Sequence, residues 1–251
     1  SYYEFNGTIY EQVPGTSTTS FFTTDYDGAM PGGHSGVQYA LTPDASSLST
    51  GVYKWKMHVT YHWDDEWTPD QEKEIEGYQL ILNDSVSAFG KGWQFSEAPN
   101  LTLQNDAKTV TLRSGQNAHV FFQSGDSTYT NGVGLDHSVG ALVKLEGNTT
   151  NGFDYFDKNG TQWKYYANGR IFKSIDRNGN TTEYHYANGG TDQLEYILYP
   201  NGRRTKFEYD GGYVSRIIQG ALANGTGGTS TSFFIENGLL KSITGEDADG
   251  E

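Results

Sequence analysis

Hydrophobic positions in the first third of the chain alternate with polar ones at the two-residue period of a half-buried β-strand. The clearest run is 51–61, where Val, Tyr, Trp and Met alternate with polar residues through most of its length. A second run, 78–82, follows an acidic stretch at 64–76. Together the two runs predict a hairpin whose long connection is acidic.

Further short strands are expected on both sides of this hairpin. Upstream they lie at 18–24 and 37–41, and four or more strands at this spacing predict a β-sandwich of immunoglobulin-like size. Downstream, short apolar runs are joined by turns rich in Asn, Asp, Gly and Ser, and they lie at 101–103, 109–112 and 118–122. No apolar stripe at helical spacing occurs, so the predicted fold class is all-β.

From about residue 146 the pattern becomes repetitive, and strand-like runs alternate with turns that contain Asn-Gly. Runs that end in Tyr166, Tyr186 and Tyr209 follow one another at spacings of 20 and 23 residues. Within a run such as 183–186, polar and aromatic residues alternate, so we expect one face to carry rings and the other charges. Asn-Gly favours a two-residue hairpin with both central residues at positive φ. One such hairpin cannot bury its aromatic face alone, so successive hairpins are expected to stack.

The stretch 174–186 reads X-X-Asp-X-Asn-Gly-Asn-Thr-Thr-X-Tyr-X-Tyr. It resembles the YD or RHS repeat family, whose members include bacterial RHS proteins, toxin-complex shells and teneurins. The Phe-Gly-X-Gly-Trp element at 89–93 is similar to the segment with which many RHS regions open. The resemblance covers about residues 89–245. It departs from the family pattern in that only Tyr209-Asp210 keeps the literal Tyr-Asp pair.

The expected architecture is an N-terminal β-sandwich followed by a curling antiparallel sheet of YD/RHS-type β-hairpin repeats. The predicted domains are the sandwich at 1–88, the opening β segment of an RHS region at 89–145, the hairpin repeats at 146–245 and an acidic tail at 246–251. The resemblance implies a fragment of a larger bacterial protein. Its function would be that of a secreted or cell-surface scaffold that mediates extracellular interaction, with the rest of a larger RHS chain among its partners.

Charge and composition exclude several other classes. The 31 acidic and 17 basic residues give a formal net charge of −14, which repels nucleic acids and anionic membrane surfaces. No stretch approaches the roughly 20 apolar residues of a membrane-spanning helix. The absence of cysteine excludes disulfides, thiolate catalysis and Cys-ligated zinc. An acidic β protein rich in Gly, Asn and Thr is typical of exported bacterial chains.

Aromatic side chains are the candidate binding groups. Exposed rings in a β protein rich in Tyr and Trp can stack on sugar rings, which favours polysaccharides or cell-surface glycans as partners. The tryptophans that we expect to bind them are Trp63, Trp67, Trp93 and Trp163.

The acidic connection offers an enzymatic alternative. Asp64, Asp65 and Glu66 lie between two tryptophans, and a pair of carboxylates could serve as acid and base in glycoside hydrolysis. Adjacent carboxylates seldom face each other across a substrate as that reaction requires, so a solvated loop anchored by its tryptophans is the favoured interpretation. The chain is expected to act without catalysis, and a glycoside hydrolase-like enzyme that uses the 64–76 loop is the alternative.

Metal binding is the remaining candidate chemistry. Stretches 25–28, 154–160 and 176–180 carry oxygens at alternate positions as calcium loops do, but they lack the Gly and Glu that an EF-hand needs. Asp and Asn that cap their own backbone explain these stretches as turns. His58 and His62 would lie roughly 13 Å apart on a strand, too far for one ion. We predict no cofactor, with calcium as the alternative.

Overall fold

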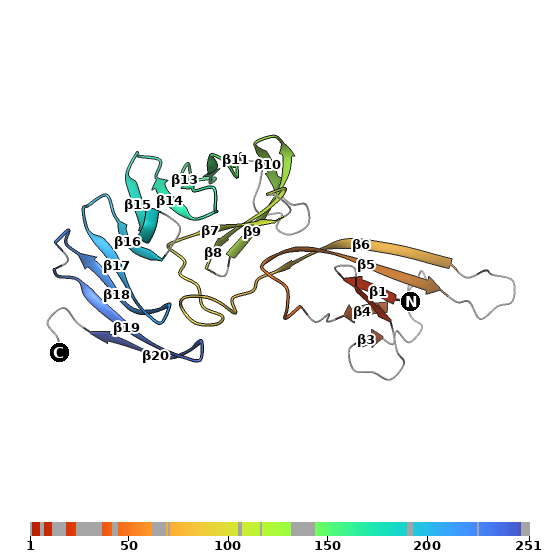
Figure 1. The fold of residues 1–251 in the computed structure, drawn as a ribbon. Helices are drawn as coiled ribbons and strands as arrows, with labels where there is room; N and C mark the ends of the chain where they lie inside the picture. The colour runs from red at the N-terminus through yellow and green to blue at the C-terminus, as the bar shows by residue number, and fades with distance from the viewer. Residues whose placement is uncertain are drawn as a thin grey trace, which may run out of the picture. The chain divides into compact units, whose positions relative to one another are not determined.

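The computed structural model describes residues 2–5, 8–11, 19–23, 37–41, 45–61, 69, 71–104, 107–115, 117–131, 144–189, 193–224 and 226–246. Most of these residues lie in antiparallel strands, and the described part contains no α-helix, only a 3-10 turn at Ala187–Gly189. The all-β prediction is confirmed. The chain divides into two compact units, Ser1–Ile81 and Leu82–Glu251, each with its own sheets (Figure 1).

The N-terminal unit contains a four-stranded antiparallel sheet in the order β2-β1-β5-β6 and a separate β3-β4 hairpin. Its strands are β1 (Tyr2–Phe5), β2 (Thr8–Glu11), β3 (Thr19–Thr23), β4 (Val37–Leu41), β5 (Gly51–Tyr61) and β6 (Gln71–Ile81). The strands expected at 18–24, 37–41 and 51–61 are therefore present. The packing of these sheets into an immunoglobulin-like sandwich stays a prediction.

The expected loop at 64–76 is wrong for its second half, because Gln71–Glu76 belongs to β6. Strand β5 is 11 residues long, and β6 pairs with it over its whole length. The carboxylates of β6 fit this hairpin because basic side chains of β5 lie opposite them. Lys54 contacts Glu76 at 2.7 Å, and Glu74 contacts both Lys56 at 3.1 Å and His58 at 3.3 Å. Cross-strand charge pairs thus replace the apolar alternation that marks a strand in the sequence.

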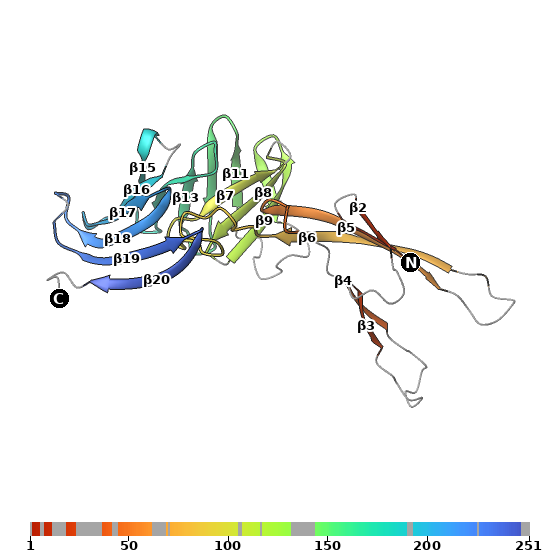
Figure 2. The same ribbon diagram turned by 60° about the horizontal axis from the view of Figure 1, so that its bottom comes forward.

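The C-terminal unit contains a single antiparallel sheet of 14 described strands, each paired with its neighbours in sequence (Figure 2). The strands are β7 (Asn100–Gln104), β8 (Thr109–Ser114), β9 (Asn117–Gly125), β10 (Thr128–Asn131), β11 (Lys144–Asn148), β12 (Gly152–Phe156), β13 (Gln162–Tyr165), β14 (Ile171–Ile175), β15 (Thr181–Tyr186), β16 (Leu194–Leu198), β17 (Arg204–Asp210), β18 (Tyr213–Ala221), β19 (Thr229–Glu236) and β20 (Leu239–Glu246). The sheet runs without interruption through residue 145, where the sequence suggests a boundary.

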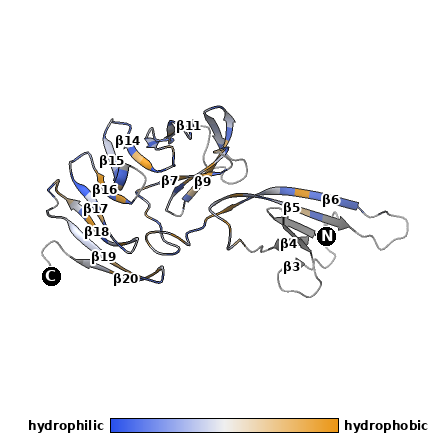
Figure 3. Cartoon of the chain, viewed as in Figure 1, coloured by the Kyte–Doolittle hydropathy of each residue, from blue (hydrophilic) through white to orange (hydrophobic). Residues whose placement is uncertain are grey.

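One face of this sheet carries the hydrophobic core. Tyr165 is 1% exposed, Tyr184 is 8% exposed and Phe207 is 6% exposed, whereas Glu208 next to Phe207 is exposed. The expected separation of rings from charges is therefore confirmed for these strands, and Figure 3 shows polar and apolar segments following one another along them. Burial of the rings supplies the main stabilisation, because apolar surface is removed from water.

The opposite face carries a ladder of polar and aromatic contacts. Glu183 lies 3.7 Å from Lys173 and 3.3 Å from His185. The His185 ring stacks on Tyr196 with 4.3 Å between centroids, and Arg204 lies 4.4 Å above the same tyrosine ring. Such cross-strand pairs stabilise an exposed sheet face by about 0.2–1 kcal/mol each.

The sheet is curved, so strands that are distant in its order meet. Asn100 of β7 forms an isolated β-bridge with Arg170, and the Leu101 N–H donates to the Gly169 carbonyl at 2.8 Å. On the core side, Phe121 of β9 packs edge-on against Tyr155 of β12 with 6.0 Å between ring centroids. The curvature thereby buries aromatic rings between strands of the same sheet.

The Asn-Gly turns reverse the chain as expected, but four of them are not two-residue hairpins. In the turn at 157–161 the Asp157 N–H donates to the Thr161 carbonyl at 3.0 Å, and only Gly160 has positive φ. Turns at 166–170, 176–180 and 199–203 have the same bonds. Each is a type I turn followed by a left-handed glycine. Among the Asn-Gly pairs that the structure describes, only Asn237-Gly238 has both residues at positive φ, 53° and 75°.

In the two turns that begin with aspartate, the first side chain supports this geometry. The Asp157 carboxylate accepts hydrogen bonds from the backbone N–H groups of Asn159 and Thr161, both at 2.8 Å. Asp176 does the same for Asn178 at 2.8 Å and Asn180 at 2.9 Å. These bonds hold the residue after the aspartate in a type I turn and leave the left-handed position to glycine.

We expect Gly169→Ala to lower the free energy of unfolding by about 2–4 kcal/mol, since the substitution combines left-handed strain with an overlap. Gly169 has φ +86°, and an added Cβ would lie 2.1 Å from the Leu101 carbonyl oxygen. Gly179→Ala is the matched control, because Gly179 has φ +84° in the same turn type and an added Cβ would meet nothing within 4 Å. Urea unfolding of both variants measures the difference; equal losses would show that the contact with β7 contributes nothing.

Candidate binding site at the rim of the C-terminal sheet

Residues 82–99, here called the inner segment, lie against the concave face of the C-terminal sheet (Figure 2). The Ala88 carbonyl accepts a hydrogen bond from the Val214 N–H of β18 at 2.8 Å. The Lys91 N–H donates to the Gly238 carbonyl, between β19 and β20, at 2.7 Å. The segment therefore binds strands that follow it by more than a hundred residues in the chain.

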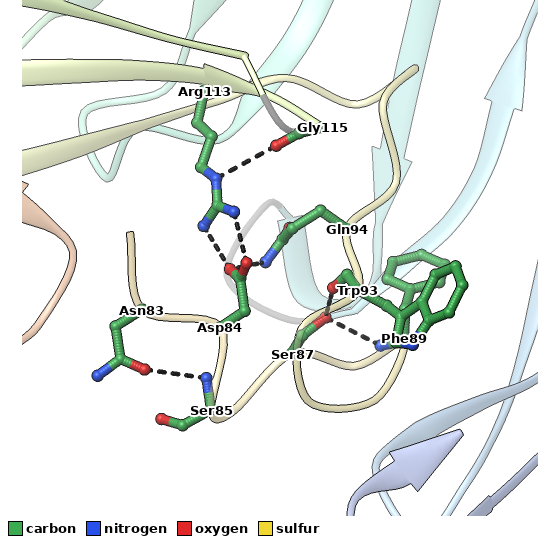
Figure 4. A network of polar contacts seen from close by, with 9 residues as sticks. All are labelled: Asn83, Asp84, Ser85, Ser87, Phe89, Trp93, Gln94, Arg113 and Gly115. Atoms are coloured by element: carbon green, nitrogen blue, oxygen red, sulfur yellow. Dashed lines mark hydrogen bonds and ion pairs between the residues drawn. The ribbon is translucent and has the colours of Figure 1, made fainter. Parts of the chain in front are cut away.

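A buried ion pair fixes the beginning of the inner segment (Figure 4). The Arg113 guanidinium of β8 donates to both carboxylate oxygens of Asp84, with Nη2 to Oδ2 at 2.6 Å. The Arg113 side chain is only 5% exposed and that of Asp84 11%. Gln94 donates to Asp84 at 2.8 Å, and Arg113 Nε donates to the Gly115 carbonyl at 3.3 Å. The charges are thus paired bidentately, and each side chain has one further hydrogen bond.

The ion pair also sets the protonation of Asp84. Burial raises the pKa of this carboxyl, but the hydrogen bonds from Arg113 and Gln94 and the charge of Arg113 together outweigh burial and hold the pKa below its ordinary value. Asp84 is therefore a carboxylate at neutral pH.

The Phe89–Trp93 element forms compact turns in which Gly90 has φ +94° and Gly92 φ +84°. The Ser87 hydroxyl donates to the Trp93 carbonyl and accepts from the Phe89 N–H at 3.1 Å (Figure 4). The rings before and after this element reach the core. Phe89 stacks on Phe95 at 5.5 Å, and Phe95 packs edge-on against Phe207 of β17 at 5.1 Å.

A pocket of about 600 Å³ lies between the inner segment and strands β15 to β17. We call it the rim pocket, because two of its lining residues belong to connections at the edge of the sheet. Arg170 follows the β13–β14 turn, and Gln193 ends the β15–β16 connection. Its other polar and aromatic lining residues include Gln94, Phe95, Asn100, Tyr186 and Tyr209. Such a mixture of aromatic walls with a few polar groups is typical of small-molecule sites.

Arg170 is the positive charge of the rim pocket. Its guanidinium lies over the Tyr186 ring, 5.5 Å from the centroid. Burial raises the pKa of Tyr186, and burial raises the pKa of Tyr209 to about 12, while the charge of Arg170 opposes both shifts. The guanidinium is therefore close to two tyrosine hydroxyls. Among the described residues, no carboxylate forms an ion pair with it.

A second, smaller pocket contains the predicted binding residue Trp163. It measures about 260 Å³ and is lined by Glu97 of the inner segment together with Trp163, Tyr184 and Tyr199. Tyr184 donates to the Glu97 carbonyl at 3.0 Å and Tyr199 to the Glu97 carboxylate at 2.7 Å. The polar groups of this pocket thus bind one another.

The structure does not bring the predicted tryptophans together in one site. Trp163 is half-buried and its ring lies 5.2 Å from that of Tyr155. The Trp93 side chain is 52% exposed. Trp63 and Trp67, and with them the carboxylates Asp64, Asp65 and Glu66 of the enzymatic alternative, lie outside the described residues.

The turn carboxylates considered as calcium ligands bind backbone N–H groups. Asp157 and Asp176 each cap their own turn in this way, which confirms their interpretation as turn residues. Within the described part of the chain, no group of three or more His, Asp or Glu side chains is placed to hold a metal ion. His58 contacts Glu74, while His62 lies outside the described residues.

Arg170, Tyr186 and Gln193 were not singled out as site residues from the sequence. Tyr186 carries the repeat pattern and reads as a core ring, and Gln193 carries no signal. Arg170 directly follows an Asn-Gly turn, but so does Arg203, whose guanidinium donates to the Gly220 carbonyl at 2.7 Å. The two arginines differ in their surroundings, which depend on the curvature of the sheet and not on the local sequence.

Fold and site together define an all-β protein with a curved antiparallel sheet, an anchored inner segment and a pocket at the sheet rim. No known protein-family model and no curated protein matches the sequence. In the described residues, none of the helical structure is long and apolar enough to cross a membrane.

We expect Asp84→Asn to lower the free energy of unfolding by about 3 kcal/mol, because Arg113 would remain buried without a counter-charge. Asp154→Asn is the control: its partner Lys164 lies 3.0 Å away, but both side chains are about one-third exposed. That change should cost less than about 1 kcal/mol. Chemical denaturation measures both; similar losses would remove the ion pair as the anchor of the inner segment.

The low pKa of Asp84 also predicts a pH dependence. A carboxyl whose pKa is lower in the folded than in the unfolded chain stabilises the fold at pH values above its ordinary pKa of 3.8. That contribution is lost as the pH falls through the folded-state pKa. We expect the stability difference between wild type and Asp84→Asn to be constant near neutral pH and to shrink below pH 3.8. Denaturation curves across this range test it, and a difference independent of pH would contradict it.

Proposed function

We propose that this chain is a scaffold segment of a secreted or cell-surface protein of the RHS/YD-repeat type and that it mediates extracellular interaction by binding glycans. The proposal combines the repeat resemblance with the surface chemistry of the C-terminal unit. Its partners would be polysaccharides or cell-surface glycans and the rest of a larger chain.

The observation that carries the scaffold part is the sequential pairing of all 14 described strands of the C-terminal sheet. Each hairpin adds two strands and more apolar side chains to the concave face. Stability then comes from nearest-neighbour contacts, as in other repeat proteins, and the array can carry binding surfaces without a catalytic centre.

Two aromatic features support the glycan part. Trp93 presents half of its side chain to solvent, and it immediately precedes two residues that line the rim pocket. Trp163 lines the smaller pocket beside the Glu97 carboxylate. Sugar rings stack on such indoles through their apolar C–H faces, and neighbouring carboxylates and amides pair with hydroxyls.

A glycan array probed with the purified chain, with and without calcium, tests this function. We expect one polysaccharide class to be bound in both conditions. We also expect Trp93→Ala to weaken that binding at least fivefold, because it removes an exposed ring, while stability changes by less than about 1 kcal/mol. Phe234→Ala is the control, since Phe234 is exposed to a similar extent, 57%.

A blank array in both conditions would remove glycan recognition and leave the scaffold role alone. Equal binding by both variants and wild type would exclude Trp93 from the site. The same comparison with Trp67→Ala tests the predicted loop site in the N-terminal unit.

A further inference from the structure

We propose that the rim pocket binds a hexuronic acid residue of an acidic polysaccharide, with the Arg170 guanidinium paired to the sugar carboxylate. The inference rests on the proposed glycan recognition. It places that recognition in a pocket whose lining residues include none of the four predicted tryptophans, although Trp93 directly precedes two of them.

The position of Arg170 carries the first step. Among the described arginines, Arg113 pairs with Asp84, and Arg203 and Arg204 donate to backbone carbonyls. Arg170 is half-buried in a pocket wall, yet its guanidinium has no hydrogen bond or carboxylate partner in the described part of the chain, only the Tyr186 ring beneath it. A planar guanidinium presents a fork of donors that matches a carboxylate. The pocket therefore contains a preformed site for one negative charge.

The backbone of Arg170 is held in place by its own turn and by β7. Its carbonyl accepts from the Tyr166 N–H at 2.8 Å, and its own N–H donates to the Asn168 side chain at 3.1 Å. The bridge to Asn100 ties the same residue to β7. Ligand binding at such a site needs little rearrangement of the main chain, which reduces the entropic cost.

The remaining lining favours a sugar over other carboxylates. Gln94 donates its amide N–H to Asp84, and its amide oxygen is still able to accept a hydrogen bond from a ligand hydroxyl. The side-chain amides of Asn100 and Gln193 are exposed and combine donors with acceptors, as hydroxyl-rich ligands require. The rings of Phe95 and Tyr186 supply apolar surface for the C–H face of a pyranose. An amino-acid carboxylate would use Arg170 but leave these amides unmatched.

Size and local charge agree with this ligand. The pocket volume of about 600 Å³ lies within the range of small-molecule sites, which is about 300–1,000 Å³. The negative net charge of the whole chain would repel an acidic polymer, but residues 144–246 contain 11 basic and 11 acidic residues. The excess of acid lies elsewhere in the sequence, so the repeat region does not oppose an anionic ligand.

The test is calorimetric titration of the full chain with trigalacturonic acid. We expect saturable binding that weakens with added salt, and binding at least tenfold weaker for Arg170→Gln. Arg170→Lys keeps the positive charge but loses the forked pair of N–H donors. Its affinity should therefore lie between those of wild type and Arg170→Gln. Arg177→Gln is the matched control: it removes the same charge from an exposed turn outside the pocket and should bind as wild type does.

A second variant guards against an effect on folding. Gln193 is exposed at the pocket rim, so Gln193→Ala should leave the unfolding midpoint unchanged and weaken binding about threefold through the lost amide contact. The neutral trisaccharide with its carboxylates reduced to alcohols should bind at least tenfold more weakly than trigalacturonate. Triglutamate, which offers carboxylates without sugar rings, should also bind more weakly.

Three results would overturn the inference: no binding of trigalacturonate by wild type, unchanged affinity in Arg170→Gln, or equal binding of triglutamate. In each case the glycan array decides the proposed function separately. An array that shows other glycans bound, with affinity lost in Trp93→Ala, would keep the proposed function and move its site away from the rim pocket.

Discussion

The buried pair of Arg113 and Asp84 is the constraint on which the C-terminal unit depends. Taking two charges out of water is costly, and the cost is offset only where geometry and hydrogen bonds are complete. The pairing here is bidentate, and Gln94 and the Gly115 carbonyl add one hydrogen bond to each partner. The inner segment therefore has one favourable position on β8.

The position of Asp84 determines how the rest of the inner segment packs. With Asp84 fixed, Phe89 and Phe95 reach the ring of Phe207, and Glu97 reaches two tyrosines of the sheet. Phe89 and Phe95 also form part of one wall of the rim pocket, and the opposite wall consists of β15 to β17. A pocket made by a strand-free segment and a sheet would be mobile without an anchor at its base. The ion pair thus acts on the binding surface through packing.

Much of the β-structure of both units could be predicted from local sequence, because strand 51–61 and the rings of Tyr184 and Phe207 follow a two-residue period. The two-residue apolar period is missing from the charge-rich stretch Gln71–Glu76 and from the polar strand β10. Cross-strand partners stabilise both. The turn type also escaped prediction, because Asn-Gly fits two geometries and the four type I turns share no first residue: two begin with Asp and two with Tyr. The site was the least predictable part, because a contact such as that of Tyr199 with Glu97 joins residues 102 positions apart.

Sequential pairing has a consequence for the order in which the chain is made. Strands that pair only with their neighbours can form hairpin by hairpin as the polypeptide leaves the ribosome, since local contacts close at little entropic cost. The inner segment is the exception. It is synthesised before β7, yet its partners Val214 and Gly238 come more than a hundred residues later. Phe89 and Phe95 therefore stay uncovered for most of synthesis, and docking of the inner segment is completed only when the last hairpin has emerged.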